Sequence, residues 1–574
     1  MCKIQINGKI VEAEEGTMLL DTLRNNGIKV PTLCNVKGLS PTGACRMCVV
    51  EVEGMNNLVP SCAFPVSDGM SVKSHSPRAL EARRTIIELL LSSHPDDCNY
   101  CSRNGSCELQ SMAVELGIRQ RRYKGSYKKR DLDVSNPAIV RDPEKCILCG
   151  RCVRVCEEIQ HVAAIDFTGR GSGSVVETSF NQGLNVSSCV NCGQCLLVCP
   201  TGALVEKSNV DDVMKAIMDK DKHVVLQHAP SVSVSLAEEF GVKAGKNIEG
   251  ELVAAARIIG FDRVFDTSFS ADLTIMEEAA ELVDRVVNGG KLPMMTSCSP
   301  GWIKFVEQFY PEFIDNLSTC KSPQQMMGAI IKSYYAQREN INPENIISVA
   351  VMPCTAKKFE ASRNEMTVNN IPDVDYVLTT REFAKLIRCH GINIEHIAPE
   401  EPDTPFGERS SAGKLFGASG GVMEAAIRTA YFMITGKSMT DLKVQILRGQ
   451  KDLKETSVTI GDKTINVAAV SGLENAQKLL DDIKNKKRDY QFIEVMTCPG
   501  GCINGGGQPF NMDIETVKKR ASAIYNVDKN ETLRQSHENR SIKRLYDEFL
   551  IEPLSHKSHV LLHTKYMDRS QILK

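Results

Sequence analysis

The first residues of the chain alternate between polar and apolar side chains. This alternation covers residues 3–13 on both sides of an Asn-Gly pair, which predicts two strands joined by a primed turn. In residues 17–27 three leucines stand at helical spacing, which predicts a helix with Thr17 as its N-cap and Gly27 at its end. The N-terminus is therefore expected to form a small sheet with one helix.

Further along the chain the pattern first becomes helical and then extended. Residues 80–110 carry apolar side chains at helical spacing ahead of His94. Residues 169–180 are rich in glycine, but they continue as a β-type run rather than a helix. A strand hairpin is therefore favoured there over a dinucleotide-binding loop. Linkers are expected at 124–137 and 207–222.

From residue 223 onward, strand-like and helix-like segments alternate. Apolar runs at 223–229 and 345–353 predict buried strands, and the patterns at 231–241 and 274–290 predict amphipathic helices. This alternation is typical of an α/β domain, in which functional residues lie at strand ends.

Composition indicates a large protein of a reducing compartment. The 574 residues include 22 cysteines, and no secretory signal precedes them. No run of 18 apolar residues predicts a membrane span, and a net charge of −2 gives no argument for binding nucleic acid. We therefore expect a cytoplasmic protein with neither a membrane nor a nucleic-acid partner. The basic run Arg119–Arg130 is either a solvated loop or a docking site for an acidic electron carrier.

Eight cysteines in the segment 146–199 form two runs of the type Cys-x2-Cys-x2-Cys-x3-Cys. In this pattern the fourth cysteine of each run ligates the other cluster. A disulfide framework needs no such triplets, and zinc sites usually pair Cys-x2-Cys with a second pair or with histidine. We therefore predict two four-iron clusters, and their ligand sets are Cys146, Cys149, Cys152 and Cys199, then Cys156, Cys189, Cys192 and Cys195.

Two further sets of possible iron ligands precede this segment. A C-x10-C-x2-C-x13-C series resembles a plant-type two-iron ferredoxin with the spacing of respiratory-complex relatives, although four thiolates could also hold zinc. The second set begins with a histidine. Three cysteines follow it at ligand spacing, which favours metal binding by this histidine. This set resembles the histidine-ligated four-iron domain of iron hydrogenases and of complex I. The two sets are Cys34, Cys45, Cys48 and Cys62, then His94, Cys98, Cys101 and Cys107.

Three short loops in the α/β region carry further cysteines beside glycine or proline: TSCSPGW at 296–302, MPCTAKKFE at 352–360 and EVMTCPGGCINGGGQP at 494–509. They resemble the three signature motifs of the iron-only (FeFe) hydrogenases, both the multi-cluster clostridial form and the catalytic subunit of NAD(P)-linked enzymes. That resemblance implies an H-cluster, which is a four-iron cubane joined to a two-iron unit that carries CO, cyanide and a bridging dithiolate amine. It assigns Cys354 and Cys498 as cubane ligands and Cys502 as the bridging ligand.

The same resemblance assigns residues around the two-iron unit. Lys357 matches a lysine that hydrogen-bonds a cyanide ligand, and a fixed ammonium suits an anionic group. Met352 and Met496 match packing residues, whose polarizable thioethers suit a dry pocket. A loop over the second cyanide matches Ala229, Pro230 and Ser231.

The chain departs from the family pattern at Ser299. Cys298 falls on the proton-transferring cysteine, and Ser299 falls on the fourth cubane ligand. Serine binds iron only as an alkoxide, which forms far less readily than a thiolate. Three assignments remain open: Ser299 ligates the cubane, Cys298 shifts into the ligand position, or the cubane uses water or stays open there. We favour Ser299 at the ligand position with Cys298 as the proton donor.

A row of titratable residues completes the resemblance. Glu278, Glu281 and Arg285 are spaced to share one helical face, and Ser318 matches the remaining member of the family's proton relay. A solvated charged face is the alternative interpretation. With Cys298 these residues would carry protons between the cluster and water. The other cysteines, Cys320 among them, are expected to be ordinary small residues.

These expectations describe a modular α+β protein. A β-grasp 2Fe-2S domain is expected at 1–78, a 4Fe-4S domain with one histidine and three cysteine ligands at 79–126 and a bacterial-type two-cluster domain at 138–209. A large α/β H-cluster domain is expected at 210–512, wrapped by a small-subunit-like segment at 513–574. The implied reaction is reversible conversion of H2 into protons and electrons.

The implied cofactors are one 2Fe-2S cluster, three accessory 4Fe-4S clusters and the H-cluster. Electrons would be exchanged with ferredoxin or with flavin subunits that use NAD(P), because the chain has no convincing nucleotide site. Two other functions are an electron-transfer subunit of a complex I-like enzyme, which the three loops disfavour, and a hydrogen sensor or assembly-related protein with low turnover.

Overall fold

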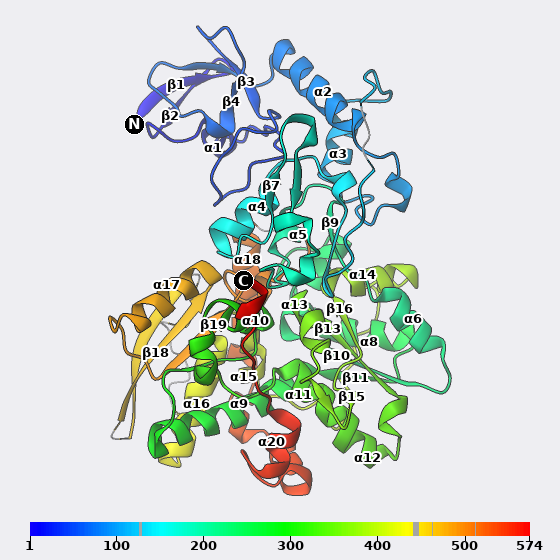
Figure 1. The fold of residues 1–574 in the computed structure, drawn as a ribbon, viewed down its shortest axis with the longest axis vertical. Coiled ribbons are helices and arrows are strands. Elements are labelled where there is room, and N and C mark those ends of the chain that lie inside the picture. The colour runs from blue at the N-terminus through cyan, green and yellow to red at the C-terminus, as the bar shows by residue number, and fades with distance from the viewer. Residues whose placement is uncertain (126–128, 440–446, 450, 462, 511–512, 574) are drawn as a thin grey trace.

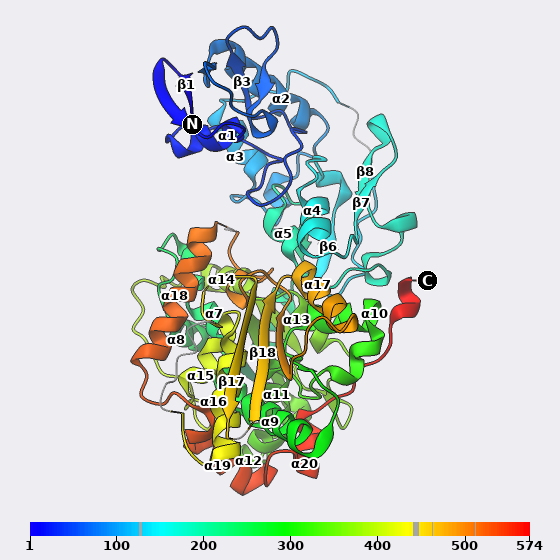
Figure 2. The same ribbon diagram turned by 90° about the vertical axis from the view of Figure 1, so that its left-hand side faces the viewer.

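The computed structural model shows several small modules at one end of a larger α/β body (Figures 1 and 2). The structure describes residues 1–125, 129–439, 447–449, 451–461, 463–510 and 513–573. No helix in these ranges has the length and apolar character needed to cross a bilayer. Part of the expected linker at 124–137, residues 126–128, lies outside the described residues.

The first module is a five-stranded sheet in the order β2-β1-β5-β3-β4. Its strands are β1 (Cys2–Ile6), β2 (Lys9–Ala13), β3 (Val49–Val52), β4 (Val59–Pro60) and β5 (Ser71–Lys73). The predicted hairpin is confirmed, because β1 and β2 pair antiparallel on either side of Asn7 and Gly8, which both have positive φ.

The helix of this module is α1 (Leu19–Asn25). Thr17 is not its N-cap, so that prediction was wrong: Met18 stands at the cap position, and the Thr17 hydroxyl donates to the Glu14 carbonyl instead. The leucines of α1 are buried in the core beneath the sheet.

The second module contains α2 (Pro77–Ser92) and α3 (Glu108–Glu115). Ser76 caps α2 by accepting the Ala79 N–H at 3.2 Å. The predicted helix at 80–110 therefore holds only in part, because α2 ends before His94 and the following cysteines lie on turns.

The third module pairs β6 (Ile139–Arg141) with β9 (Leu204–Glu206) and contains α4 (Arg151–Arg154) and α5 (Gln194–Val198). The glycine-rich segment forms the predicted hairpin, β7 (Asp166–Thr168) with β8 (Val175–Glu177). The linker predicted at 207–222 was wrong: it contains α6 (Val210–Met218), whose apolar side packs on the core of the body.

Two four-stranded sheets form the α/β body. The first is parallel, in the order β11-β10-β13-β16, and the second has the order β12-β19-β18-β17. The strands of the first are β10 (His223–His228), β11 (Arg263–Asp266), β13 (Ile346–Met352) and β16 (Tyr376–Thr379); those of the second are β12 (Met294–Met295), β17 (Leu453–Ile460), β18 (Lys463–Ser471) and β19 (Phe492–Met496).

The central helix of the body is α9 (Thr267–Asp284), which contacts α11 (Pro323–Ile330), α15 (Ser411–Lys414) and α16 (Gly421–Thr435). It confirms the helix expected at 274–290, although the last turn is a π-turn.

The helix expected at 231–241 is replaced by two short turns, α7 (Pro230–Ser233) and a 3-10 turn at Leu236–Phe240. The hydroxyls of Ser233 and Ser235 donate to nearby backbone carbonyls, which competes with a regular helix.

The C-terminal segment contains α18 (Ile514–Asn530), α19 (Arg540–Leu545) and α20 (His556–Leu562). Helices α19 and α20 lie on the body at the end away from the small modules (Figure 2). Their side chains Ile542, Leu545, Leu561 and Leu562 join the buried cluster beneath α9 and α11.

Candidate metal centres and catalytic cavity

One cavity in the body lies where β10, β13 and β19 reach their carboxyl ends, a common place for sites in parallel sheets. Its empty volume is about 820 Å³. These strand ends and their loops, together with the loop after β12, bring together residues that the sequence singled out in separate motifs: Ala229, Pro230, Ser231, Cys298, Ser299, Met352, Cys354, Lys357, Met496, Cys498 and Cys502.

Three thiols from two of these loops line the cavity. Burial raises the pKa values of Cys354, Cys498 and Cys502, the last to about 12, so metal-free thiols there hold their protons. Gly501 has a φ of +101°, and a Cβ at this position would lie 2.6 Å from the Ser419 nitrogen. Glycine is therefore needed for the loop between the two C-terminal thiols to pack this closely.

Ser299 and Cys298 face different neighbours. The Ser299 hydroxyl lies 2.7 Å from the Thr497 hydroxyl and accepts the Thr497 N–H at 3.3 Å, next to Cys498. The Cys298 thiol is buried, which raises its pKa, and the nearby Glu278 carboxylate raises it further. The serine is thus directed toward the Cys498 loop, and the cysteine is electrostatically coupled to helix α9.

The cavity wall holds polar groups that remain available to a bound group. Lys357 donates to the Glu360 carboxylate at 2.9 Å and to the Cys298 carbonyl at 3.1 Å, which leaves one of its three N–H donors. The hydroxyl of Ser231 and the side-chain oxygen of Gln324 are buried without a partner among the described residues. Three thiols, an ammonium and an unpaired hydroxyl fit an anionic iron cofactor.

A row of polar residues leads away from Cys298. Burial raises the pKa of Glu278 to about 8, and the charge of Glu281 adds to this shift. Ser318 donates to Glu281 at 2.9 Å, and Arg285 donates to the other oxygen of the same carboxylate at 2.6 Å. The structure therefore brings together, on one side of α9, the four residues that the sequence placed in a relay.

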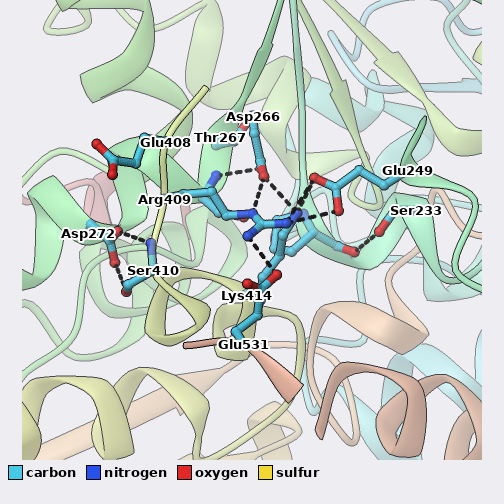
Figure 3. Close-up of polar contacts among 12 residues, drawn as sticks. Ser233, Glu249, Asp266, Thr267, Asp272, Glu408, Arg409, Ser410, Lys414 and Glu531 are labelled. Carbon is cyan, nitrogen blue, oxygen red and sulfur yellow. Dashed lines mark hydrogen bonds and ion pairs between the residues drawn. The ribbon is translucent and has the colours of Figure 1, made fainter. Parts of the chain in front are cut away.

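A charged network beside the cavity was missed by the sequence analysis. Asp266, at the carboxyl end of β11, accepts from Lys414 at 2.6 Å and from Arg409 at 2.9 Å (Figure 3). Burial alone would raise the pKa of Asp266, but electrostatic interaction with Lys414, then with His228 and Arg409, lowers it well below its usual range. Glu249 extends the network through Lys414 at 2.8 Å. The position of Asp266 at the end of a strand was the signal that the sequence offered.

The network supports residues that line the cavity. Asp266 precedes Thr267, and the neighbouring strand β10 ends at His228, directly before Ala229. His228 is fully buried, and neither of its ring nitrogens has a partner among the described residues. Buried charge pairs of this kind hold their backbone segments in place, because separating them would leave a charge unpaired.

The eight thiols of the third module form two groups. The four thiols assigned to the first cluster, Cys199 included, line one cavity with an empty volume of about 470 Å³. Of the other group, Cys192 also lines the catalytic cavity. Hydrogen bonds join the third module to the body here: among them, Thr355 donates to the Asn191 carbonyl at 2.7 Å, and Gln194 donates to the Asn504 carbonyl at 2.9 Å.

The first module brings its expected ligands together, and the second fixes the position of its histidine. In the first, the N–H of Cys45 points at the Cys34 sulfur at 3.5 Å, and the N–H of Leu33 at the Cys45 sulfur at 3.3 Å. In the second, burial lowers the pKa of His94, and its Nδ1 lies 3.1 Å from the Pro95 carbonyl. Its buried Nε2 has no partner among the described residues, as a neutral iron ligand requires.

A salt bridge and hydrogen bonds link the third module to each of the first two. Arg154 donates to the carbonyl of Cys34, and Arg151 pairs with Glu108 at 2.7 Å. The N–H of Glu108 donates to the Pro200 carbonyl at 2.9 Å. The four sets of expected ligands therefore lie in directly contacting modules.

Family models match nearly the whole chain. Residues 222–506 match the iron only hydrogenase large subunit, C-terminal domain, and residues 514–569 match the iron hydrogenase small subunit. Upstream, residues 1–77 match a 2Fe-2S iron-sulfur cluster binding domain, residues 83–122 the NADH-ubiquinone oxidoreductase-G iron-sulfur binding region, and residues 145–203 a 4Fe-4S dicluster domain.

Whole proteins and solved structures give the same result. The chain is 46% identical to the NADP-reducing hydrogenase subunit HndD of Solidesulfovibrio fructosivorans, with 100% of both chains covered. It is 39% identical to iron hydrogenase 1 of Clostridium pasteurianum, over 99% of this chain and 100% of that one. Structures of the [FeFe]-hydrogenase HydA1 from Chlamydomonas reinhardtii superpose with a TM-score of 0.58 at 40% identity, over 63% of this chain and 99% of theirs. Since relatives align along essentially its full length at these identities, the chain belongs to the iron-only (FeFe) hydrogenase family.

Proposed function

We propose that the chain catalyses the reversible conversion of H2 into two protons and two electrons at an H-cluster in the cavity. The observation that carries this proposal is the meeting of the three cysteine loops at one cavity that also contacts Cys192. Cys354, Cys498 and Cys502 would hold the cofactor, with Ser299 at the fourth cubane position. When bound, the cofactor supplies the bond-breaking chemistry and the electron acceptor.

The protein would orient the two-iron unit with polar groups and thioethers. The free N–H of Lys357 and the unpaired hydroxyl of Ser231 suit anionic cyanide ligands. Met352 and Met496 line the same cavity and would exclude water, and Ala229 with Pro230 would close the opposite side.

Protons would move along helix α9. Cys298 would exchange a proton with Glu278, which is protonated near neutral pH because of its burial. Ser318 and Glu281 would carry the proton on, and Arg285 would lead it toward water. The hydrogen bonds around Glu281 support this order.

Electrons would move in the opposite direction, through the small modules. The proposed accessory set is one 2Fe-2S and three 4Fe-4S clusters, with the cluster that includes Cys192 nearest to the cavity. The histidine-ligated cluster is supported by the free, buried Nε2 of His94. A reducing, cytoplasmic compartment would keep these thiols available for iron.

We propose ferredoxin as the electron partner. The full-length similarity to a subunit of an NADP-reducing hydrogenase favours a second candidate, an assembly with flavin and NAD(P)-binding subunits. The experiment is a gas assay of the anaerobically matured chain, with reduced ferredoxin and NADH offered separately and together. Hydrogen evolution with ferredoxin but not with NADH is the expected result, and direct evolution with NADH alone would contradict it.

A further inference from the structure

The C-terminal segment places a histidine beside the residues of the proposed proton route. His563, which directly follows α20, is buried, and its Nδ1 lies 2.8 Å from the Thr319 hydroxyl. The N–H of Thr319 donates to the Glu281 carboxylate at 3.1 Å. Backbone hydrogen bonds fix this position, because Thr564 donates to the Thr319 carbonyl at 2.8 Å and Lys321 donates to the Leu562 carbonyl at 2.7 Å.

A second carboxylate on α9 holds the other side of the ring. Glu277, one turn before Glu281, lies 3.1 Å from His563 Nε2. It also accepts from Tyr546 and Ser558 at 2.6 Å each. Burial alone would raise the pKa of Glu277, but these hydrogen bonds, that of His563 first, lower it. A carboxylate that stays ionised accepts a hydrogen bond from the ring and so fixes its orientation.

The ring is close to both the relay and the surface. One oxygen of Glu281, one ring nitrogen of His563 and the sulfur of Cys320 lie within 4.8 Å of one another, a distance that one bridging water spans. On the outer side the ring of His559 lies 4.2 Å from that of His563, centroid to centroid, and His559 is exposed. Glu281, His563 and His559 therefore form a short row of titratable groups that leads from the proposed proton route to solvent.

We propose that His563 carries protons between Glu281 and solvent at His559, as a second exit supplied by the C-terminal segment. Glu281 releases a proton to the imidazole ring, and the ring releases one to water beside His559. This inference rests on the proposed role of Glu281. The titratable groups that face the ring are Glu277 and Glu281 on α9, Cys320, Tyr546 and His559.

The test compares His563→Gln with wild type and with a matched control, His556→Gln, which changes an exposed histidine at the start of α20. Hydrogen evolution and oxidation are measured from pH 5 to 9, with cluster infrared bands as the check on cofactor loading. Glutamine keeps hydrogen bonds but cannot titrate, so turnover should fall about fivefold or more. The ratio of variant to wild-type turnover should change with pH, because glutamine, unlike the histidine ring, cannot take up or release a proton at any pH. A purely structural role would give the same ratio at every pH and would overturn the proposal.

A double variant separates this inference from the function on which it rests. If both residues act on one route, adding His563→Gln to Glu281→Gln should slow turnover little further. An equal fold-loss in both backgrounds would overturn the proposal. Unchanged turnover in Glu281→Gln alone would instead refute the proposed route through that carboxylate.

The unloaded chain gives an independent measurement if His563→Gln fails to accept the cofactor. Carboxyl infrared absorption of Glu281, identified by its loss in Glu281→Gln, is followed as a function of pH. Because the ring nitrogen lies within 4.8 Å of the Glu281 carboxylate, the midpoint of the infrared change should move in His563→Gln and stay in place in His556→Gln. An unmoved midpoint in His563→Gln would show that the ring is not coupled to Glu281.

Discussion

The strongest quantitative prediction concerns Glu278, whose carboxyl group is buried between Cys298 and Ser318. Its pKa is about 8, against an ordinary value of 4.5, because burial disfavours the charged form and Glu281 repels it. The difference corresponds to about 5 kcal/mol, at 1.36 kcal/mol for each pH unit. At pH 7 about nine in ten molecules therefore carry the proton that Cys298 would receive for hydrogen evolution.

Two results follow for activity. Hydrogen evolution by the wild type should fall about tenfold between pH 7 and pH 9, as Glu278 ionises. Glu278→Gln should lower turnover by about a hundredfold or more, since a positioned acid or base contributes at least that much. In Glu281→Gln the fall should begin at lower pH, because removing the neighbouring charge lowers the pKa of Glu278.

A stability measurement checks the same group without turnover. Since the folded-state pKa is raised, folding takes up a proton between pH 4.5 and 8, and the stability contributed by Glu278 falls as the pH rises through this window. The stability of unloaded Glu278→Gln relative to wild type should therefore increase from pH 5 to pH 8. Asp284→Asn, exposed on the same helix, is the control. A flat activity profile up to pH 9 together with full turnover in Glu278→Gln would refute the reasoning.

Two further predictions concern iron binding. If Ser299 occupies the ligand position, Ser299→Cys should tighten cubane retention and raise the reduction potential of the cubane. Cys298→Ala should stop proton transfer while all cofactor iron is retained. Iron counting and infrared spectra test both variants, and loss of cubane iron in Cys298→Ala would reverse the two roles. His94→Gln should remove about four irons per chain, or weaken their retention, because the variant lacks the Nε2 atom proposed to ligate iron. Unchanged iron content and unchanged electron paramagnetic resonance signals would contradict this assignment.

The sequence predicted the cysteine groups better than the elements around them. Ligand spacing is a local property, so motifs such as the one at 146–199 can be recognised without a fold. The prediction of a helix at 231–241 was wrong because serine hydroxyls donate hydrogen bonds to backbone carbonyls there. Helix α6 was missed although Val210, Val213 and Ile217 stand at helical spacing, because a linker was expected between modules.

The surroundings of the site could not be predicted, because they come from distant parts of the chain. Lys414 meets Asp266 across 148 positions, and Ser299 meets Thr497 across 198. His563 reaches Glu277 from 286 positions away. No local pattern marks such pairs, and only tertiary packing brings them together. The motif residues were therefore identified from sequence, and the groups that tune them were not.

The arrangement separates the proposed paths of electrons and protons. Cys192 faces the cavity from the small modules, and on the other side α9 carries Glu278 and Glu281, with Arg285 in the π-turn that follows it. Helices α9 and α20 lie in the half of the molecule away from the small modules (Figures 1 and 2). An electron partner that docks on the small modules would therefore leave both proton exits, at Arg285 and at His559, open to water. Electron delivery would then not compete with proton exchange, so both could proceed in the same complex.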